Sequence, residues 1–197
     1  MSKHDWESGF SFVDILFTVG LLAALGALVT PPMARALDEF HTRGAARYFV
    51  SRLQHARLTA VARSAHTALR FSANEDSFSY AVFVDGNGNG LRTRDIEEDR
   101  DREILAPEQL GDQFPGVEFG TIPGLPPVDP GATPPGSDPI RIGVSDLLTF
   151  TPLGTATPGS LYIRGRGDTQ YVVRIFGETG KTRILRFNTR QQLWQRL

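Results

Sequence analysis

A run of twenty residues near the N-terminus constrains the fold more than any other feature. From Phe10 to Val29 nearly every residue is apolar, and a single carboxylate, Asp14, interrupts the run. Twenty residues form about 30 Å of α-helix, which matches the thickness of the hydrocarbon core of a bilayer. The run therefore predicts a membrane-spanning helix. Because a charge in such a helix is costly, Asp14 needs a partner or a reason.

Two ordinary membrane segments compete for this run. A secretory signal peptide would have a basic leader, a shorter apolar stretch and a small-residue cleavage site. Here the leader, residues 1–9, carries both signs of charge, and the run continues into Pro31 and Pro32 without such a site. A signal anchor fits better. In that interpretation Asp14 lies among the lipid headgroups and the chain has an unrelated function.

The order Gly9-Phe10-Ser-Phe-Val-Asp14, followed by the apolar run, resembles the class III leader of type IV pilins and type II secretion pseudopilins. The resemblance implies that prepilin peptidase cleaves after Gly9 and that Phe10 becomes the N-methylated terminus. Asp14, at the fifth mature position where the family usually has Glu, would pair with the amine of a neighbouring subunit. Pro31 lies where many pilins carry a helix-kinking Pro, and Pro32 should deepen the kink.

The segment after the proline pair predicts a long amphipathic helix. Apolar residues recur every three to five positions, apart from one longer interval between Phe40 and Tyr48, and define one stripe. The stripe consists of Met33, Leu37, Phe40, Tyr48, Leu53, Ala56 and Ala60. Five arginines occupy the other faces, namely Arg43, Arg47, Arg52, Arg57 and Arg63. They indicate a solvated face, with a nucleic-acid surface as the alternative.

The end of this helix carries a second resemblance. The spacing Ser51-x-Leu53-x-x-Ala56-Arg57-x-x-Ala60-x-x-Arg63, followed by a strand at 68–71, is similar to the GspH/FimT group of minor pseudopilins and pilins. The resemblance implies an α+β fold. A long, kinked, transmembrane N-terminal helix would pack on a C-terminal antiparallel β-sandwich. The expected parts are the leader 1–9, the transmembrane and assembly helix 10–30, its amphipathic continuation 31–66 and a β domain 67–197.

The β domain contains short segments rich in aromatic and β-branched residues. These predict strands at 68–72, 77–84, 117–119, 140–144, 147–151, 160–164, 170–176 and 182–188. Gly177–Gly180 predicts a tight hairpin between the last two. Residues 115–139 hold eight of the thirteen Pro and five Gly, and they predict a long irregular loop that is functional or mobile.

An Asn- and Gly-rich segment offers a candidate metal site. Asp85, Asn87 and Asn89 place oxygens at alternate positions, and Gly90 is the sixth residue, as in the first half of an EF-hand calcium loop. Ile96 stands where the closing acid should be, so Asp95 or a neighbouring acid would have to close a Ca²⁺ site. The simpler interpretation is a β-turn without metal or other cofactor. The following run, residues 94–103, alternates in sign and predicts a solvated loop, with a contact to another minor subunit as the alternative.

Charge is segregated along the chain, and the C-terminal part is basic. Residues 85–118 hold ten acids against four Arg, whereas from Arg141 onward nine Lys and Arg face three acids. Lys181, Arg183 and Arg186 follow one another closely in the C-terminal hairpin. Gly180-Lys-Thr-Arg183 resembles the basic turn of DNA-binding FimT-type pilins, so DNA binding is one hypothesis for this hairpin and a solvated surface the other.

Enzymatic chemistry finds little support in the sequence. The chain has no cysteine, which excludes disulfides and thiolate metal sites. The histidines, His4, His41, His55 and His66, are scattered, and no nucleophile triad or phosphate loop is recognisable. The sequence thus predicts a non-enzymatic minor pseudopilin or pilin of the inner membrane with a periplasmic C-terminal domain. Its expected partners are prepilin peptidase and other pseudopilins or pilins, and DNA uptake is the alternative function.

Overall fold

The computed structural model describes residues 11–74, 77–143 and 145–197. The chain divides into two compact units, Met1–Leu37 and Asp38–Leu197, and the long helix α1 runs through both. The elements in chain order are α1 (Phe12–Arg63), β1 (Thr67–Ala73), β2 (Phe78–Val84), α2 (Thr93–Glu97), β3 (Arg102–Gln109), α3 (Leu110–Gln113), β4 (Glu118–Phe119), β5 (Ile140–Ile142), β6 (Leu147–Phe150), β7 (Gly159–Arg164), β8 (Gln170–Ile175), β9 (Thr182–Asn188) and β10 (Leu193–Arg196).

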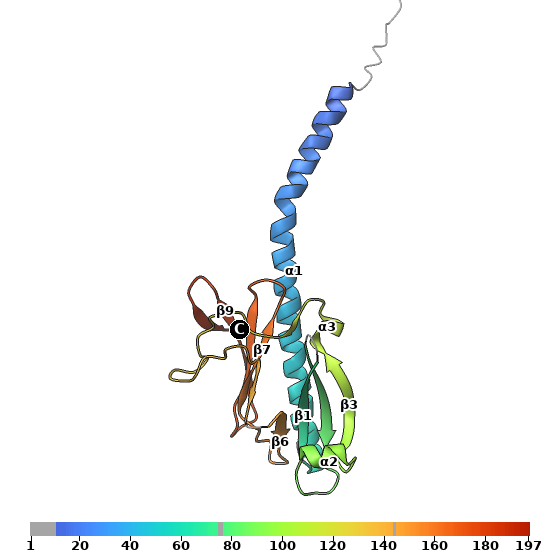
Figure 1. Cartoon of the computed structure of the whole chain (residues 1–197), viewed down its shortest axis with the longest axis vertical. Helices are drawn as coiled ribbons and strands as arrows, with labels where there is room; N and C mark the ends of the chain where they lie inside the picture. The colour runs from blue at the N-terminus through green and yellow to red at the C-terminus, as the bar shows by residue number, and fades with distance from the viewer. Residues whose placement is uncertain (1–10, 75–76, 144) are drawn as a thin grey trace, which may run out of the picture. The chain divides into compact units, whose positions relative to one another are not determined.

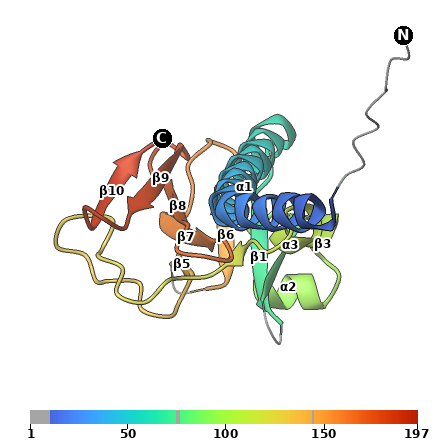
Figure 2. The ribbon, with the colours of Figure 1, turned by 90° about the horizontal axis from the view of Figure 1, so that it is seen from above.

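The strands form two antiparallel sheets. Sheet A has the order β3-β2-β1-β6, and sheet B has the order β10-β9-β8-β7-β4, with β5 also paired to β7. The second unit's part of α1 has one sheet on either side of it (Figures 1 and 2). The expected α+β arrangement of a long N-terminal helix packed on antiparallel β-structure is confirmed.

One core joins the helix to both sheets. Phe49 of α1 is fully buried, and its ring makes edge contacts with Tyr80 and Phe119 at centroid distances of 5.2 and 5.1 Å. Small side chains on the same helix face allow the backbone of α1 to approach the strands. The buried helix face consists of Thr42, Ala45, Ala46, Phe49, Leu53, Ala56 and Ala60. Aromatic edge contacts add to the free energy gained from burying such large side chains.

The stripe predicted for this helix was correct only in its second half. Leu53, Ala56 and Ala60 are buried as expected, but Met33, Leu37 and Phe40 are exposed. Phe40 precedes Thr42 of the buried face by two residues, which is roughly 200° around a helix. A spacing of three to five residues tolerated both faces, and the sheets select the one that contains Phe49.

The outer face of sheet A is covered by the segment that was expected to be a solvated loop. Residues 93–97 form α2, and Ile96 packs on Ala68, Ala81 and Phe83. Asp101, from the same segment, is only 4% exposed. The prediction of a solvated loop at 94–103 was therefore correct only in part: seven of these ten residues are exposed, but Asp95, Ile96 and Asp101 are buried and the segment begins as a helix docked through Ile96.

The Pro- and Gly-rich segment 115–139 packs on the outer face of sheet B. Leu125 is buried with Tyr162, Val172 and Phe187 of the sheet. The indole N–H of Trp194 donates to the carbonyl oxygen of Pro126 at 3.0 Å. The segment contains the two-residue strand β4 and is otherwise irregular, as expected, but it serves as a cover for the sheet.

Two strands were not predicted. β3 reads Arg-Glu-Ile-Leu-Ala-Pro-Glu-Gln and β10 reads Leu-Trp-Gln-Arg, so neither shows the alternation of a half-buried strand. Both are edge strands, where charged residues and proline are tolerated because one side of the backbone needs no partner.

We expect Phe49→Ala to destabilise the folded chain by about 3–5 kcal/mol, because it removes a fully buried ring and leaves a cavity. Phe40→Ala is the matched control on the same helix. Its side chain is 73% exposed, so we expect a change below about 0.5 kcal/mol. Urea unfolding of the full chain in detergent measures both. Equal effects of the two substitutions would contradict the described core.

Candidate assembly helix and basic groove

Asp14 lies in the first turn of α1. Its carboxylate Oδ2 accepts the N–H of Ser11 at 3.2 Å, and the N–H of Asp14 donates to the carbonyl oxygen of Ser11 at 2.9 Å. This reciprocal arrangement satisfies backbone groups that a helix start leaves unpaired. Among the described residues, Oδ1 of Asp14 has no hydrogen-bond partner. Gly9 and Phe10, the predicted cleavage and methylation residues, lie outside the described residues.

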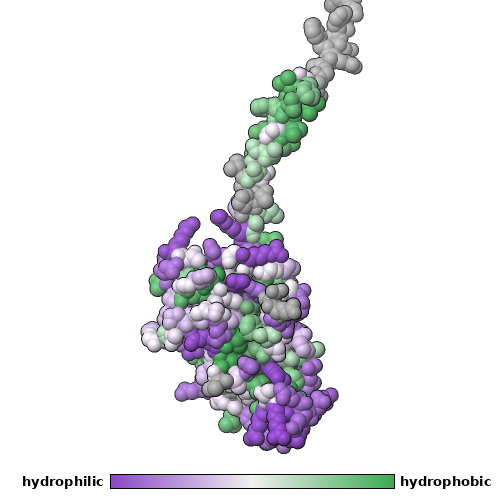
Figure 3. All heavy atoms as spheres, viewed as in Figure 1, coloured by the Kyte–Doolittle hydropathy of each residue, from purple (hydrophilic) through white to green (hydrophobic). Residues whose placement is uncertain are grey.

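From residue 12 to residue 27, α1 presents exposed apolar side chains on all sides. Its most apolar window of eighteen residues has a mean hydropathy of 2.3, and none of that window is buried. Figure 3 shows a continuous apolar surface on the described residues before the grey segment of the helix. Within the described ranges, α1 is the helix long and apolar enough to cross a membrane. A helix that is apolar all round requires a bilayer or other helices around it.

The proline pair lies inside this helix. α1 continues through Pro31 and Pro32 as one helix. The kink predicted at these two residues stays a prediction.

Arg57, from the motif at the end of α1, ties the helix to two turns of the β domain. Its Nε donates to the carbonyl oxygen of Gly154 at 2.9 Å. It also lies against Gly180, where an added Cβ would come within 2.8 Å of Nε and where φ is +59°. Leu53, Ala56 and Ala60 of the same motif are buried. The motif thus specifies a helix face that packs and an arginine that holds the β6–β7 and β8–β9 turns.

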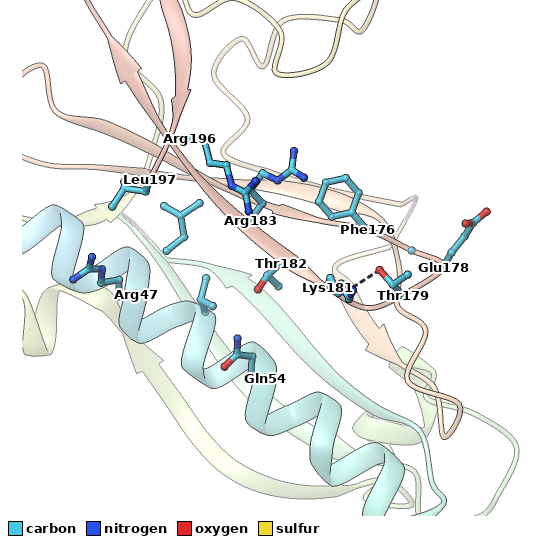
Figure 4. Close-up of a pocket in the computed structure, with 13 residues that line it drawn as sticks. Arg47, Gln54, Phe176, Glu178, Thr179, Lys181, Thr182, Arg183, Arg196 and Leu197 are labelled. Atoms are coloured by element: carbon cyan, nitrogen blue, oxygen red, sulfur yellow. Dashed lines mark hydrogen bonds between the residues drawn. The ribbon is translucent and has the colours of Figure 1, made fainter.

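A groove of about 770 Å³ lies between α1 and β9. Its cationic side chains are Arg47 of α1, Lys181 and Arg183 of the hairpin, and Arg196 of β10. Figure 4 shows Thr182 on the side of β9 that faces α1 and Arg183 on the other side, beside Phe176. The Arg183 guanidinium lies 5.2 Å from the centroid of the Phe176 ring. Two of the predicted basic residues, Lys181 and Arg183, thus lie in one groove with Arg47 and Arg196, which were not predicted as part of this site.

Arg186, the third predicted basic residue, does not line this groove. Its guanidinium pairs with the carboxylate of Glu39 on α1, and that carboxylate also accepts the phenol O–H of Tyr171 at 2.9 Å. Burial, followed by this hydrogen bond, raises the pKa of Tyr171 above its ordinary value, so the phenol remains a donor. Arg183 and Arg186 differ by three positions, so a strand directs them to opposite faces.

The Asp85 turn is closed by backbone hydrogen bonds. The carboxylate of Asp85 accepts the N–H groups of Asn87, Gly88 and Gly90 at 3.1, 2.7 and 2.8 Å. Asn87 Oδ1 accepts the N–H of Asn89 at 3.0 Å. Gly86 is required here, because an added Cβ would lie 2.1 Å from the carbonyl oxygen of Arg100.

One further acid reaches this turn: Oδ1 of the buried Asp101 accepts the N–H of Gly86 at 3.2 Å. Asp95 points to Arg100, with 3.4 Å between Oδ1 and Nη1, and Ile96, at the position of the closing acid, is buried on sheet A. In the part of the chain that is described, no three His, Cys, Asp or Glu residues gather as a metal site would require. Ca²⁺ binding at Asp85, Asn87, Asn89 and Asp95 stays a prediction.

A polar cluster around Glu108 was missed from the sequence. Its carboxylate accepts the phenol O–H groups of Tyr80 and Tyr48 at 2.9 and 3.1 Å and pairs with Arg52 at 2.7 Å. Burial, together with the neighbouring Glu108, raises the pKa of Tyr80. These residues lie 28 to 60 positions from Glu108, so no local pattern could have grouped them. The cluster joins α1 to β2 and β3.

We expect Asp85→Asn to reduce stability at neutral pH by about 1 kcal/mol and to weaken its dependence on acid. Burial would raise the pKa of Asp85, but the N–H groups of Gly90, Gly88 and Asn87 outweigh it and the pKa is lowered. The stabilisation is therefore complete above the unfolded value, about 3.9, and is lost as the pH falls through the folded pKa.

Urea unfolding midpoints of the full chain in detergent, followed from neutral pH to about pH 3, measure this effect. Asp99→Asn, an exposed acid of the neighbouring turn, is the control. An unchanged acid dependence in the Asp85 variant would contradict the assignment.

Comparison with known proteins agrees with this architecture. Residues 45–179, more than half of the chain, match the family described as Type II transport protein GspH. The match runs from the buried part of α1 to the β8–β9 turn. It therefore covers most of the core that α1 forms with the two sheets. No curated protein and no solved structure matched the chain. The chain belongs to the GspH family, whose members are structural pseudopilins of type II secretion and not enzymes.

Proposed function

We propose that the chain is a minor pseudopilin that prepilin peptidase cleaves after Gly9 and that assembles through α1 into a type II secretion pseudopilus. The observation that carries the proposal is the part of α1 from residue 12 to residue 27, which presents exposed apolar side chains on all sides and has one acid in its first turn. A GspH-like core on the second half of the same helix supports it. The chain then resides in the inner membrane as a single-pass protein with its C-terminal domain in the periplasm.

The apolar helix serves two environments in this proposal. Before assembly its side chains face lipid, and after assembly they face the helices of other pseudopilins. Because lipid tails and apolar side chains are similarly nonpolar, the transfer between them needs no change in the helix. A type IV pilus would use the same helix in the same way.

Asp14 supplies the polar contact in an otherwise apolar bundle. An isolated carboxylate in such surroundings is costly, and a nearby cation offsets that cost. The N-terminal amine that cleavage creates on Phe10 of a neighbouring subunit is a cation of the required kind. The Oδ2 atom of Asp14 already accepts the N–H of Ser11, which leaves Oδ1 for the amine.

DNA binding through the C-terminal hairpin is the second candidate function, as in FimT-type pilins. The observation that favours it is the grouping of Lys181 and Arg183 with Arg47 and Arg196 in one groove. Arg186 contributes less to such a surface, because it is paired with Glu39. A gel shift with the full chain in detergent tests it: a salt-sensitive shift that requires Lys181 and Arg183 would establish DNA binding, and no shift at low salt would exclude it.

We expect Asp14→Ala to abolish incorporation into the assembly while membrane insertion and folding remain intact. The substitution removes the partner of the amine and makes the helix more apolar, so insertion is not impaired. Asp14→Glu is the matched control: it retains the charge and should support incorporation. Cross-linking in membranes measures insertion. The amount of the chain in assemblies sheared from the cells measures incorporation. Normal incorporation of Asp14→Ala would contradict the proposed role.

A further inference from the structure

The groove between α1 and β9 carries positive charge that the molecule does not neutralise. Across the described part of the chain, none of Arg47, Lys181, Arg183 and Arg196 forms an ion pair, whereas Arg52, Arg164 and Arg186 each do. Glu178 is the one acidic side chain among the residues that line the groove. An excess of cations over acids favours an acidic ligand through electrostatic complementarity.

Part of the groove lining is apolar, and we call the part formed by Val50, Ile184 and Leu197 the apolar floor. Val50 of α1 and Ile184 of β9 are half-buried there, and Leu197 is 42% exposed at one end. Thr182 and Gln54 add small or neutral polar groups. A ligand that filled the groove would therefore present apolar side chains as well as acids.

One edge of β9 is open beside this floor. β10 pairs with β9 only from Leu185 to Asn188, and the N–H of Leu197 extends the pairing to the carbonyl oxygen of Ile184 at 3.3 Å. β8 occupies the opposite edge along Thr182 to Arg186. Since alternate residues of a strand direct their backbone groups to the same edge, Thr182 directs its N–H and C=O beside those of Ile184. No described residue pairs with Thr182 on that edge.

An unpaired strand edge is a template for a further strand. Peptides often bind in this way, with backbone hydrogen bonds supplying affinity and flanking pockets supplying specificity. The open edge at Thr182 lies between the apolar floor and the cations, so one extended segment could use all three features together.

We propose that this groove binds an extended acidic segment of another protein, which adds as a strand to the open edge of β9 at Thr182. Side chains on one face of that segment rest on Val50 and Ile184. Acidic side chains on the other face lie near Arg183 and Arg196, which stand on the outer face of sheet B by strand alternation. This contact belongs to the β domain and is separate from assembly through α1.

The observations favour a protein segment over DNA. Phe176 is the one aromatic side chain among the residues that line the groove, and the guanidinium of Arg183 lies over its ring. Single-stranded nucleic acid relies on free aromatic faces for base stacking. Phosphates would use the cations but neither the apolar floor nor the backbone of Thr182.

Binding of a short probe to the full chain in detergent tests the proposal. The probe is a fluorescent peptide of about eight residues, the length of an ordinary strand, in which Glu and Val alternate. Two peptides serve as controls: in one, Lys replaces Glu, and in the other, alternate amides are N-methylated and cannot pair with a strand. An oligothymidine of similar length is the nucleic-acid arm. Fluorescence anisotropy at low salt should show the acidic peptide binding at least about tenfold more tightly than all three.

Two further measurements locate the site. The combined substitution Lys181→Glu and Arg183→Glu should weaken binding by about tenfold or more, whereas Arg190→Glu should have little effect. Arg190 is an exposed cation of the β9–β10 turn that does not line the groove. In the unsubstituted chain, hydrogen exchange of the Thr182 amide should slow by at least about tenfold when the peptide binds.

Any of four results would overturn the proposal. These are no binding of the acidic peptide, equal binding of the N-methylated peptide, unchanged exchange at Thr182, and tighter binding of the oligothymidine. The exchange measurement uses the unsubstituted chain, so it does not depend on the folding of any variant. Failure of this proposal leaves assembly through Asp14 unaffected, since that function is measured in membranes by incorporation.

Discussion

The packing of α1 on both sheets is the interaction on which the rest of the structure depends. Along one helix the sequence must change from apolar on every side to apolar on one face. The change falls around Leu37 and Asp38, where the two compact units meet in the sequence. Beyond it, alanines alternate with Phe49 and Leu53, so the backbone lies close to the strands and two large side chains fill the space between them. The first part of the helix therefore suits apolar surroundings, whereas the second part suits packing on the β domain.

Polar contacts fix where the helix rests on the sheets. Asp38 accepts the backbone N–H groups of Arg166 and Gly167 in the β7–β8 turn. Farther along, Glu108 reaches α1 from β3 and Arg57 reaches the turns after β6 and β8. Apolar contacts alone would tolerate a shift of the helix along its axis, because alanine side chains are small and do not interlock with the strands. Directional hydrogen bonds at three levels of the helix remove that freedom.

Much of the helix and strand arrangement could be predicted from the sequence, because it depends on local patterns of residues. The length of the apolar run, the small residues of the motif that includes Ala56 and Ala60, and the β-branched alternation of β8 and β9 each depend on neighbouring positions. The helix face was harder to predict: Phe40 and Phe49 both fit an apolar spacing, and only the sheets distinguish them. The Glu108 cluster and the pairing of Arg186 with Glu39 join residues that are distant in sequence, so the candidate groove could be predicted only in part. Lys181 and Arg183 were expected there, whereas Arg47 and Arg196 required the fold.

Assembly as proposed requires that α1 carry a processed N-terminus. It is tested most directly by mass spectrometry of the chain purified from membranes of cells that contain prepilin peptidase. We expect a chain that begins at an N-methylated Phe10. A chain in the assembly that still retained residues 1–9 would contradict it, because the amine that Asp14 is proposed to neutralise would not exist.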